Sequence, residues 1–374
     1  MNIVYLGKYT LNKVHASAGT KRVLNQIRYL AIDNRVNVIT ISHYSSDYEC
    51  NLNLKRHDSN LLRLLTIPIH WVFVCFWLVA NKQPGRNILL LESVVELNFA
   101  IPVLFSKLVG YKLVHDVIEN FFLPETETSF ISRMNKVVSL LFYRIITSYA
   151  DGIIVISERL FEQYSLLRLP VLKLYNSVEI RQLAVDLEEK NETTTFLYSG
   201  TFGIKDAVQD LLRAFIRVSQ DYTNVKLVLT GRNESDYFQE CMELIQTNER
   251  ICYLGYLDSD LLEKAYRNAD VLVATRNSSQ FADYGFPYKL SEYLSFGKPV
   301  IASAVSDIPM LFTDYEDILL VEPSNIESIA KKMKFAIDNR HILKGIAEKG
   351  FDKCNRYFSI NRIGKDLSDF LTTI

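Results

Sequence analysis

Residues 284–303 read YGFPYKLSEYLSFGKPVIAS, and this stretch decides how the rest of the sequence is interpreted. A loop that contains glycine and proline leads into a short helix, and Gly297 and Pro299 end that helix before a strand at Val300–Ala302. Such a loop can bring backbone N–H groups to an anionic ligand at the N-terminus of the helix. The stretch therefore predicts a loop and a helix that bind an anion, followed directly by a strand.

Glu292 is the candidate binding residue on this helix. It falls about one turn into the helix, where its carboxylate can accept hydrogen bonds from two vicinal hydroxyl groups. Most glutamates simply lie at the surface. Glu292 stands between Tyr288 and Tyr293 and beside Leu290 and Leu294, which have the character of core residues. These neighbours favour a role in binding.

Short β-branched or leucine-rich runs alternate with stretches of helix length on both sides of this segment. Strands are predicted at Asn2–Leu6, Val36–Ile41, Asn87–Leu91, Lys112–Val117, Gly152–Ile156 and Val171–Leu174, and again at Thr195–Ser199, Lys226–Thr230, Ile251–Leu254, Val271–Ala274, Val300–Ala302 and Ile318–Val321. Helices predicted between the first strands include Thr20–Ala31, Leu97–Val109 and Ser132–Tyr149. Continuous apolar strands separated by helices indicate parallel sheets covered on both faces. The predicted fold class is α/β, with two Rossmann-like, doubly wound domains that face a cleft, and ligands in such sheets bind beyond the carboxyl ends of the strands.

The stretch Glu179–Thr195 breaks this alternation, because it is polar and has little to bury. It is the predicted boundary between a domain of residues 1–180 and a domain of residues 195–357. A chain of 374 residues is too long for one ordinary core and suits two domains of comparable size. Hydrophobic residues make up 48% of the chain and charged residues 23%, so each domain has enough apolar surface for a core.

Charge and cysteine content limit the partners and the compartment. The 42 lysines and arginines against 43 aspartates and glutamates leave a formal charge of -1, so no global charge points to a nucleic acid partner. The five cysteines form no CxxC motif and no Cys/His cluster with zinc-ligand spacing, and reduced thiols in a cytoplasmic protein are expected. The N-terminal run MNIVYLGKY enters a strand directly, so no signal peptide is expected.

The stretch Leu61–Ala80 is strongly apolar and contains both tryptophans of the chain. Arg63, Pro68 and His70 interrupt it and argue against a membrane-spanning helix. Two interpretations stay open. The stretch is either a helix packed on a sheet or a helix that lies on a membrane surface.

Residues 284–303 resemble the donor-site signature of family 4 glycosyltransferases, which have the GT-B architecture and mostly retain the anomeric configuration of the sugar. That signature has two glutamates eight positions apart, followed by a turn of small residues and Gly-x-Pro-Val. Glu292 matches the second glutamate, which in the family holds the ribose hydroxyls of the nucleotide. Tyr284 stands in place of the first, which in the family makes a contact near the sugar. Residues 287–289 (PYK) resemble the Pro-x-Lys form of this loop in capsule- and lipopolysaccharide-type members, so Lys289 is a predicted substrate-binding residue.

The stretch Tyr198–Phe215 (YSGTFGIKDAVQDLLRAF) resembles the motif that opens the C-terminal domain of the family, where an arginine and a lysine clamp the diphosphate. Lys205 is the candidate for this lysine and for a catalytic role, although strict spacing puts Asp206 at the position of the family lysine. Thr201 replaces the arginine, so one cation is absent or supplied from elsewhere. A lysine in a turn is usually just solvated, but its place after Ser-Gly-Thr and before a helix favours a phosphate contact.

Further matches to the family follow in the expected order. Ile251–Tyr256 (ICYLGY) resembles the strand and loop that cradle the nucleotide base, so Gly255 and Tyr256 are predicted base contacts. The amides near Gly285 and Phe286 are predicted to stabilise the leaving diphosphate. Lys226–Gly231 and Leu262–Asp270 match a strand that ends at a glycine and a later helix of the family. A place in the core explains each of these three matches taken alone, and their order supports the resemblance.

The resemblance assigns the acceptor to the domain of residues 1–180, the nucleotide sugar to the domain of residues 195–357, and residues 358–374 to a helix that crosses back to the N-terminal domain. Gly19 matches a loop glycine that approaches the donor phosphate and the acceptor. Lys21 and Arg22 follow it, and solvent exposure on the next helix is the simplest expectation for both.

The end of the strand Lys112–Val117 resembles the edge that touches the acceptor or the transferred sugar in the family. Any of His115, Asp116 and Glu119 can take the proton of the acceptor hydroxyl. Strand alternation sends His115 and Asp116 to opposite sides of the sheet. A structural role for His115 is an equal alternative.

The resemblance implies transfer of a sugar from a nucleoside diphosphate sugar to a hydroxyl group, with retention of configuration. No Asp-x-Asp motif stands in a suitable loop, so neither an obligatory divalent cation nor a cofactor besides the nucleotide sugar is expected. The Pro-x-Lys branch implies surface polysaccharide assembly, with a lipid-linked saccharide as acceptor at the inner face of the membrane. Membrane contact through Leu61–Ala80 or through basic residues such as Lys136 and Arg144 is a hypothesis.

Three alternatives stand beside this function. A nucleotide-sugar epimerase shares the architecture. A catalytically silent partner subunit is the second, because Thr201 and Tyr284 replace residues that the family uses and function depends on the site rather than the fold. An NAD-dependent dehydrogenase is disfavoured, because no GxGxxG follows the first strand of either half.

Overall fold

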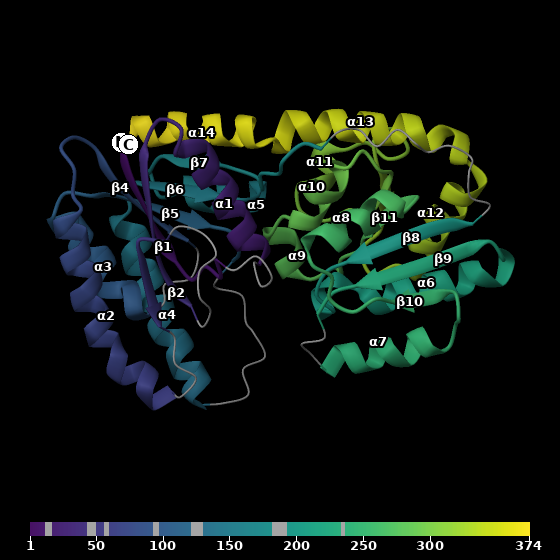
Figure 1. The fold of residues 1–374 in the computed structure, drawn as a ribbon, viewed down its shortest axis with the longest axis horizontal. Coiled ribbons are helices and arrows are strands. Elements are labelled where there is room, and N and C mark those ends of the chain that lie inside the picture. The colour runs from purple at the N-terminus through teal and green to yellow at the C-terminus, as the bar shows by residue number, and fades with distance from the viewer. Residues whose placement is uncertain are drawn as a thin grey trace. The chain divides into compact units, whose positions relative to one another are not determined.

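The computed structural model describes residues 1–11, 17–42, 50–55, 60–92, 97–120, 130–181, 193–232 and 236–374. The chain divides into two compact units (Figure 1). Unit 1 comprises Met1–Tyr175 together with Ile360–Ile374, and unit 2 comprises Asn176–Ser359. Both ends of the chain therefore belong to unit 1.

Unit 1 is built on a seven-stranded parallel sheet with the strand order β3-β2-β1-β4-β5-β6-β7. The strands are β1 (Asn2–Gly7), β2 (Arg35–Ser42), β3 (Leu52–Lys55), β4 (Asn87–Glu92), β5 (Lys112–Val117), β6 (Gly152–Val155) and β7 (Val171–Lys173). Every residue of β1 and β6 is buried, because helices cover both faces of the sheet.

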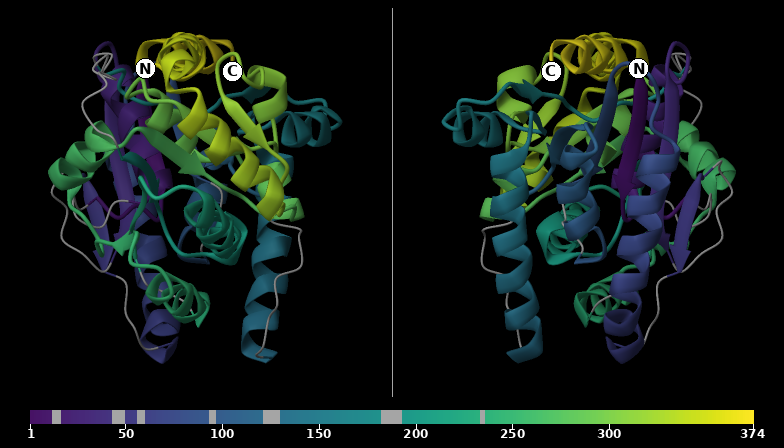
Figure 2. Two further views of the ribbon diagram at one scale, coloured as in Figure 1. Left: turned by 90° about the vertical axis from the view of Figure 1, so that its right-hand side faces the viewer. Right: turned by 90° about the vertical axis from the view of Figure 1, so that its left-hand side faces the viewer.

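The helices of unit 1 form two groups. They are α1 (Ala18–Leu30), α2 (Asn60–Ala80), α3 (Leu97–Leu108), α4 (Phe130–Tyr149), α5 (Glu158–Ser165) and α14 (Ile360–Thr373). α1 packs against α14, whereas α2, α3 and α4 pack in a row (Figure 1 and Figure 2). The connection from β1 through α1 to β2 and the connection from β4 through α3 to β5 run toward opposite edges of the sheet. Because both connections are right-handed, α1 and α3 lie on opposite faces of the sheet. Gly364 allows the close contact of α14 with α1, since a Cβ there would lie 2.1 Å from Cγ of Tyr29.

Unit 2 is built on a six-stranded parallel sheet with the strand order β10-β9-β8-β11-β12-β13. The strands are β8 (Thr194–Ser199), β9 (Val225–Thr230), β10 (Ile251–Tyr253), β11 (Val271–Ala274), β12 (Val300–Ser303) and β13 (Leu319–Val321). The helical segments are η1 (Ile204–Asp206), α6 (Val208–Asp221), α7 (Asp236–Gln246), α8 (Ser259–Asn268), α9 (Gln280–Tyr284), α10 (Tyr288–Leu294), α11 (Ile308–Leu311), α12 (Ile326–Asp338) and α13 (Arg340–Phe358).

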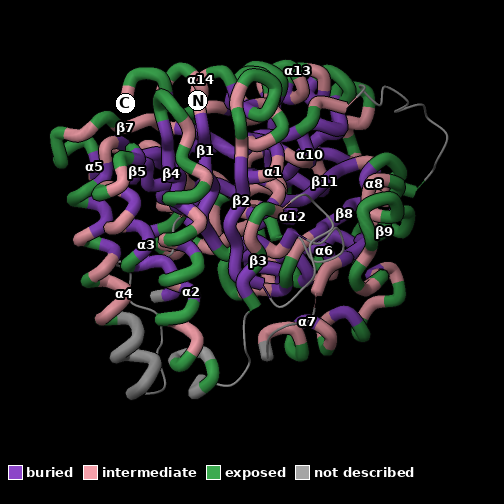
Figure 3. Tube along the Cα trace, turned by 60° about the vertical axis from the view of Figure 1, so that its left-hand side comes forward, coloured by how far each residue is buried: buried purple, intermediate pink, exposed green. Residues whose placement is uncertain are grey.

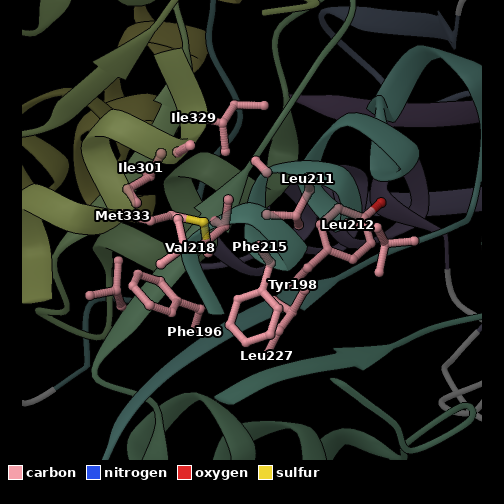
Figure 4. Packing of buried hydrophobic residues seen from close by; sticks show 14 of the residues in the cluster. Phe196, Tyr198, Leu211, Leu212, Phe215, Val218, Leu227, Ile301, Ile329 and Met333 are labelled. Atoms are coloured by element: carbon pink, nitrogen blue, oxygen red, sulfur yellow. The ribbon is translucent and has the colours of Figure 1, made fainter. Parts of the chain in front are cut away.

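The core of unit 2 lies between this sheet and the helices α6 and α12. Phe196 and Leu227 from the sheet meet Phe215 from α6 and Met333 from α12, and all four side chains are fully buried (Figure 4). This packing holds the strands of unit 2 rigidly, so the residues at their carboxyl ends have defined positions.

The two parallel sheets confirm the predicted α/β class with two doubly wound halves. Each predicted strand is present, with both ends within one residue of the predicted bounds. The edge strand β3 was not predicted, because Leu52–Lys55 is short and half polar. The boundary predicted at Glu179–Thr195 falls largely on residues 182–192, which lie outside the described residues. Residues 360–374, which contain α14, belong to unit 1.

Candidate functional site

Two glycine turns bring the carboxyl ends of β8 and β9 together. Gly200 and Gly231 have φ angles of +151° and +150°, which residues with a side chain rarely adopt. A Cβ on Gly231 would lie 1.7 Å from the carbonyl oxygen of Gly200. The carbonyl of Gly255 accepts hydrogen bonds from the N–H of Gly231 at 3.0 Å and from the hydroxyl of Thr230 at 2.6 Å. The carboxyl edge of the unit 2 sheet is thus a set of closely packed backbone turns.

Replacing Gly231 by alanine is expected to lower the free energy of unfolding by about 3 kcal/mol, because the new Cβ meets a backbone carbonyl and the φ angle is strained. Urea unfolding followed by circular dichroism measures the change. Gly345→Ala is the control, since a Cβ at Gly345 of α13 meets no atom within 4 Å. Equal stabilities of the two variants would show that this turn does not need a glycine.

Lys289 is held at the end of β8 by an acidic and an aromatic partner. Its Nζ donates to Oδ1 of Asp206 at 2.9 Å and to the hydroxyl of Tyr198 at 3.0 Å. It also lies 4.2 Å from the centroid of the Tyr198 ring. Gly200 leaves room for it, since a Cβ there would lie 2.8 Å from Nζ. The side chain of Lys289 is 13% exposed and that of Asp206 is 4% exposed, so the pair is largely shielded from water.

Two more cations, Arg276 and Lys205, act on the carboxylate of Asp206. Burial raises the pKa of Asp206, but the charges of Lys289, Arg276 and Lys205 outweigh burial and hold that pKa below its usual value. Burial lowers the pKa of Lys289; Asp206 opposes this shift, whereas Arg276 and Lys205 reinforce it. Three cations against one carboxylate leave an excess of positive charge, which suits an anionic ligand.

Glu292 lies three positions after Lys289 on α10, so both side chains lie on the same face of that helix. Oε2 of Glu292 accepts a hydrogen bond from the hydroxyl of Tyr266 at 3.1 Å. That hydroxyl lies 2.6 Å from Oγ of Ser199, and the hydroxyl of Tyr293 accepts from the N–H of Ser199 at 2.8 Å. The network ties α10 and α8 to the end of β8 and fixes the carboxylate of Glu292 beside the glycine turn.

The structure gives Lys205 a more exposed position than Lys289. Lys205 lies in η1, and its carbonyl accepts from the N–H of Asn277 at 3.0 Å. Thr201 is also exposed, and its carbonyl accepts from the hydroxyl of Tyr198 at 2.8 Å. Asp206, which strict spacing put at the position of the family lysine, holds Lys289 in place. Lys289 of α10 thus supplies a cation beside Asp206.

Tyr256 and Arg232 form a flat surface beside the glycine turns. Tyr256 is 46% exposed, and the guanidinium carbon of Arg232 lies 4.8 Å from the centroid of its ring. Gly255, which precedes Tyr256, has a φ of +71° and turns the chain there. A planar aromatic ligand can stack on such a surface.

The loop from Tyr284 to Phe286 is anchored rather than open. Tyr284 is half-buried at the end of α9, and the N–H of Gly285 donates a 3.3 Å hydrogen bond within that helix. Phe286 is buried against Phe358, with ring centroids 5.4 Å apart, and its carbonyl accepts from Nδ2 of Asn176 at 3.1 Å. The Gly285 amide is therefore already engaged within α9, and its predicted role toward a diphosphate gains no support from the geometry. Phe286 holds the loop through its side chain.

Arg22 and Asp116 form a buried ion pair in unit 1, with side chains 1% and 0% exposed. Arg22 also donates to the carbonyl of Leu174 at 3.2 Å. The expectation that Arg22 faces solvent is wrong, because α1 turns this residue toward the ends of β5 and β7. Asp116 is the counter-ion of Arg22, so the catalytic role predicted for it gains no support from the geometry.

Glu92 at the end of β4 was not predicted as a site residue. Its Oε1 occupies the space beside Gly19, where a Cβ would lie only 2.9 Å away. Burial and the charge of Asp116 raise the pKa of Glu92 to about 8, with Arg22 opposing and the exposed Glu119 adding to the shift. A carboxyl group that holds its proton at neutral pH thus lies beside the first turn of α1.

This pKa predicts how stability changes with pH. Because the folded state raises the pKa of Glu92 from 4.5 to about 8, the folded protein binds this proton more tightly than the unfolded chain. The contribution of Glu92 to stability is therefore complete below pH 4.5 and is lost as the pH rises to about 8. Glu92→Gln is expected to remove this part of the pH dependence, and urea unfolding across that range measures it. A wild-type and a variant curve of equal slope would contradict the prediction.

His115 lies on the other side of the sheet from Asp116, as strand alternation predicts. It is fully buried; its Nδ1 lies 3.1 Å from Oγ1 of Thr147, and its ring meets Tyr143 edge to face at 4.9 Å. Both partners belong to α4, so the geometry supports the structural alternative for His115.

Sequence reasoning missed Glu92 and Arg276. Both follow buried strands at the carboxyl edge of a parallel sheet, since Glu92 ends β4 and Arg276 stands two residues after β11. That position is where ligands bind in doubly wound sheets. A polar residue directly after a buried strand is thus the signal that could have identified them.

The fold and the unit 2 site together define a two-unit α/β protein with a cationic cluster, a fixed carboxylate and an aromatic surface at one sheet edge. Residues 179–353 match the family model described as Glycosyl transferases group 1. This part of the chain is similar to that family, and the chain has the GT-B fold of family 4 glycosyltransferases. The family match agrees with the predicted resemblance over residues 179–353.

Known proteins similar to this chain agree with that assignment. The uncharacterized glycosyltransferase MJ1607 of Methanocaldococcus jannaschii is 26% identical over 151 residues, which span 40% of this chain and 36% of that protein, little more than a third of its length. The sucrose-phosphate synthase (tll1590) from Thermosynechococcus elongatus superposes with a TM-score of 0.75 at 16% identity, over 100% of this chain and 99% of that chain. Anabaena Alr3699/HepE in complex with UDP superposes with a TM-score of 0.72 at 14% identity, over 100% of both chains.

Proposed function

We propose that this protein moves a hexose from a nucleoside diphosphate sugar to a hydroxyl group of a saccharide acceptor, with retention of configuration. The cluster of Lys289, Arg276 and Lys205 around Asp206 carries the proposal. Breaking the glycosidic bond of the donor gives its diphosphate additional negative charge. A site whose cations are fixed before the reaction stabilises that charge as it develops.

Glu292 is the proposed ribose ligand. Its carboxylate lies one turn along α10 from Lys289 and is oriented by Tyr266. The distance between the ribose and the diphosphate of one nucleotide suits two side chains on one helix face. Tyr256 with Arg232 is the proposed surface for the base. UDP in the similar structure of Anabaena HepE supports a nucleoside diphosphate as ligand.

The acceptor is proposed to be a lipid-linked saccharide of surface polysaccharide assembly. The form of the loop 287–289 supports this branch of the family. Within unit 1, Glu92, Gly19 and the exposed Glu119 lie close together at the carboxyl ends of β4 and β5. We assign the acceptor to this group of residues.

A thermal-shift screen of nucleoside diphosphates, followed by incubation of the sugar derivatives of the best one with a saccharide acceptor, tests the function. We expect one diphosphate to raise the melting temperature and its sugar to be transferred. Release of an epimerised sugar without acceptor would instead identify an epimerase. The absence of any nucleotide-dependent shift would favour a silent partner subunit.

Replacing Glu292 by glutamine is expected to weaken binding of that nucleoside diphosphate about tenfold to a hundredfold, because a charged hydrogen-bond acceptor for two hydroxyls is lost. Calorimetric titration measures the change. Glu327→Gln is the matched control, since Glu327 is 78% exposed and pairs with Arg217 at the surface. Unchanged affinity of the folded Glu292→Gln variant would exclude the ribose contact.

A further inference from the structure

Unit 1 has an apolar surface that its own core does not use. α2 exposes large side chains spaced three or four residues apart, which therefore form one stripe along the helix. The neighbouring helix α3, which packs against α2, and α4, which packs against α3, also carry exposed apolar residues. Figure 3 shows exposed segments on these helices. We call the whole set the apolar face; its members are Leu65, Ile69, Val72, Phe73, Phe76 and Val79 of α2, Ile101 and Leu108 of α3, and Val137 and Leu141 of α4.

The opposite side of α2 is firmly attached to unit 1. Val74 and Leu78 are fully buried, and the hydroxyl of Tyr111 donates to the carbonyl of Leu78 at 2.9 Å. Nδ1 of the buried His70 lies 2.9 Å from Oδ1 of Asn98 on α3. The helix therefore presents a fixed outer stripe. Among the described residues, no helix is both long and apolar enough to cross a membrane.

The charges of these helices have a single sign. The segments of α2, α3 and α4 contain no aspartate and no glutamate, and their charged residues are Arg63, Lys107, Arg133, Lys136 and Arg144. Arg144 is exposed and continues the α4 stripe of Val137 and Leu141. Lys107 forms an ion pair with Asp151. Of the cationic side chains that the structure describes on these helices, the exposed Arg144 therefore supplies the positive charge beside the apolar face.

We propose that the apolar face docks on the surface of an anionic lipid bilayer. Large exposed apolar side chains gain free energy by entering the boundary between headgroups and acyl chains, and flanking lysines and arginines are attracted to anionic headgroups. A second copy of the chain is a poorer occupant, since a two-fold interface would bring α4 helices without acidic residues, and the exposed Arg144, against each other. The docking is independent of the proposed transfer reaction and adds a membrane partner to the protein.

Cosedimentation of the full chain with vesicles tests the proposal. We expect binding to vesicles of phosphatidylcholine and phosphatidylglycerol, and weaker binding to phosphatidylcholine alone. The double substitution Val72→Ser and Phe76→Ser, at residues 69% and 73% exposed, should lower the partition coefficient about tenfold or more. Arg144→Gln should lower it about fivefold for the anionic vesicles only.

Ile32→Ser is the control, since Ile32 is 73% exposed in the turn after α1, outside the apolar face. It should leave vesicle binding unchanged. Equal binding of the wild type and the double variant, with unchanged thermal unfolding, would overturn the proposal. The proposal would also be overturned if the wild type did not bind vesicles and formed a dimer in sedimentation velocity that the double variant did not form. The occupant of the apolar face would then be a second copy of the chain. Nucleotide binding should be the same in all of these variants, so a failure of docking leaves the proposed function intact.

Discussion

The variant Lys289→Met is expected to transfer sugar about 100-fold more slowly than the wild type, because a fixed cation is removed from the place where charge develops on the leaving diphosphate. Methionine keeps most of the length of the side chain, so the change is mainly one of charge. Turnover with saturating donor and acceptor measures it. Lys205→Ala should lower turnover less than Lys289→Met does, since Lys205 is exposed and its charge is screened by solvent.

A second variant separates this effect from misfolding. Lys289→Met leaves the carboxylate of Asp206 buried without its partner, which destabilises unit 2. Adding Asp206→Asn removes that charge and should restore the melting temperature without restoring turnover. Recovery of near-normal turnover in the double variant would mean that Lys289 only balances Asp206 and does not act on the donor.

The second large effect concerns stability. Arg22→Met is expected to lower the free energy of unfolding by about 3–5 kcal/mol, because it leaves the fully buried Asp116 without its counter-ion. Urea unfolding measures the loss. Adding Asp116→Leu should recover much of it, since both charges are then absent.

Arg28→Met is the control for that prediction. Arg28 belongs to the same helix, but it is exposed, and its Nη1 lies 3.5 Å from Oδ1 of Asn25. Its replacement should change stability by about 0.5 kcal/mol at most. If Arg22→Met were equally mild, the ion pair would not contribute to the fold of unit 1.

The fold could be predicted from the sequence because the strand pattern is local. Continuous apolar runs such as Val271–Ala274 are buried on both faces of a parallel sheet and stand out from the helices that flank them. The strand β3 was not predicted from this pattern, since Leu52–Lys55 alternates apolar and polar residues and lies at a sheet edge. Glu292 could be singled out for the same reason, because its apolar neighbours on α10 are close in sequence.

The remaining site residues depend on contacts that no local pattern shows. Lys289 meets Asp206 across 83 positions, and Arg22 meets Asp116 across 94. Charge matching of this kind becomes visible only when strand order brings the partners to one sheet edge. The replacement at Thr201 therefore suggested a missing cation, whereas the fold brings Lys289 of α10 to Asp206.

Calorimetric titration with the nucleoside diphosphate selected by the thermal-shift screen, and with its nucleoside, tests the central claim most directly. The wild type should bind the diphosphate much more tightly than the nucleoside, and Lys289→Met should lose most of that difference while its affinity for the nucleoside stays the same. Equal affinities of the wild type for the two ligands, or a diphosphate affinity unaffected by Lys289→Met in the folded protein, would contradict a diphosphate site at Lys289.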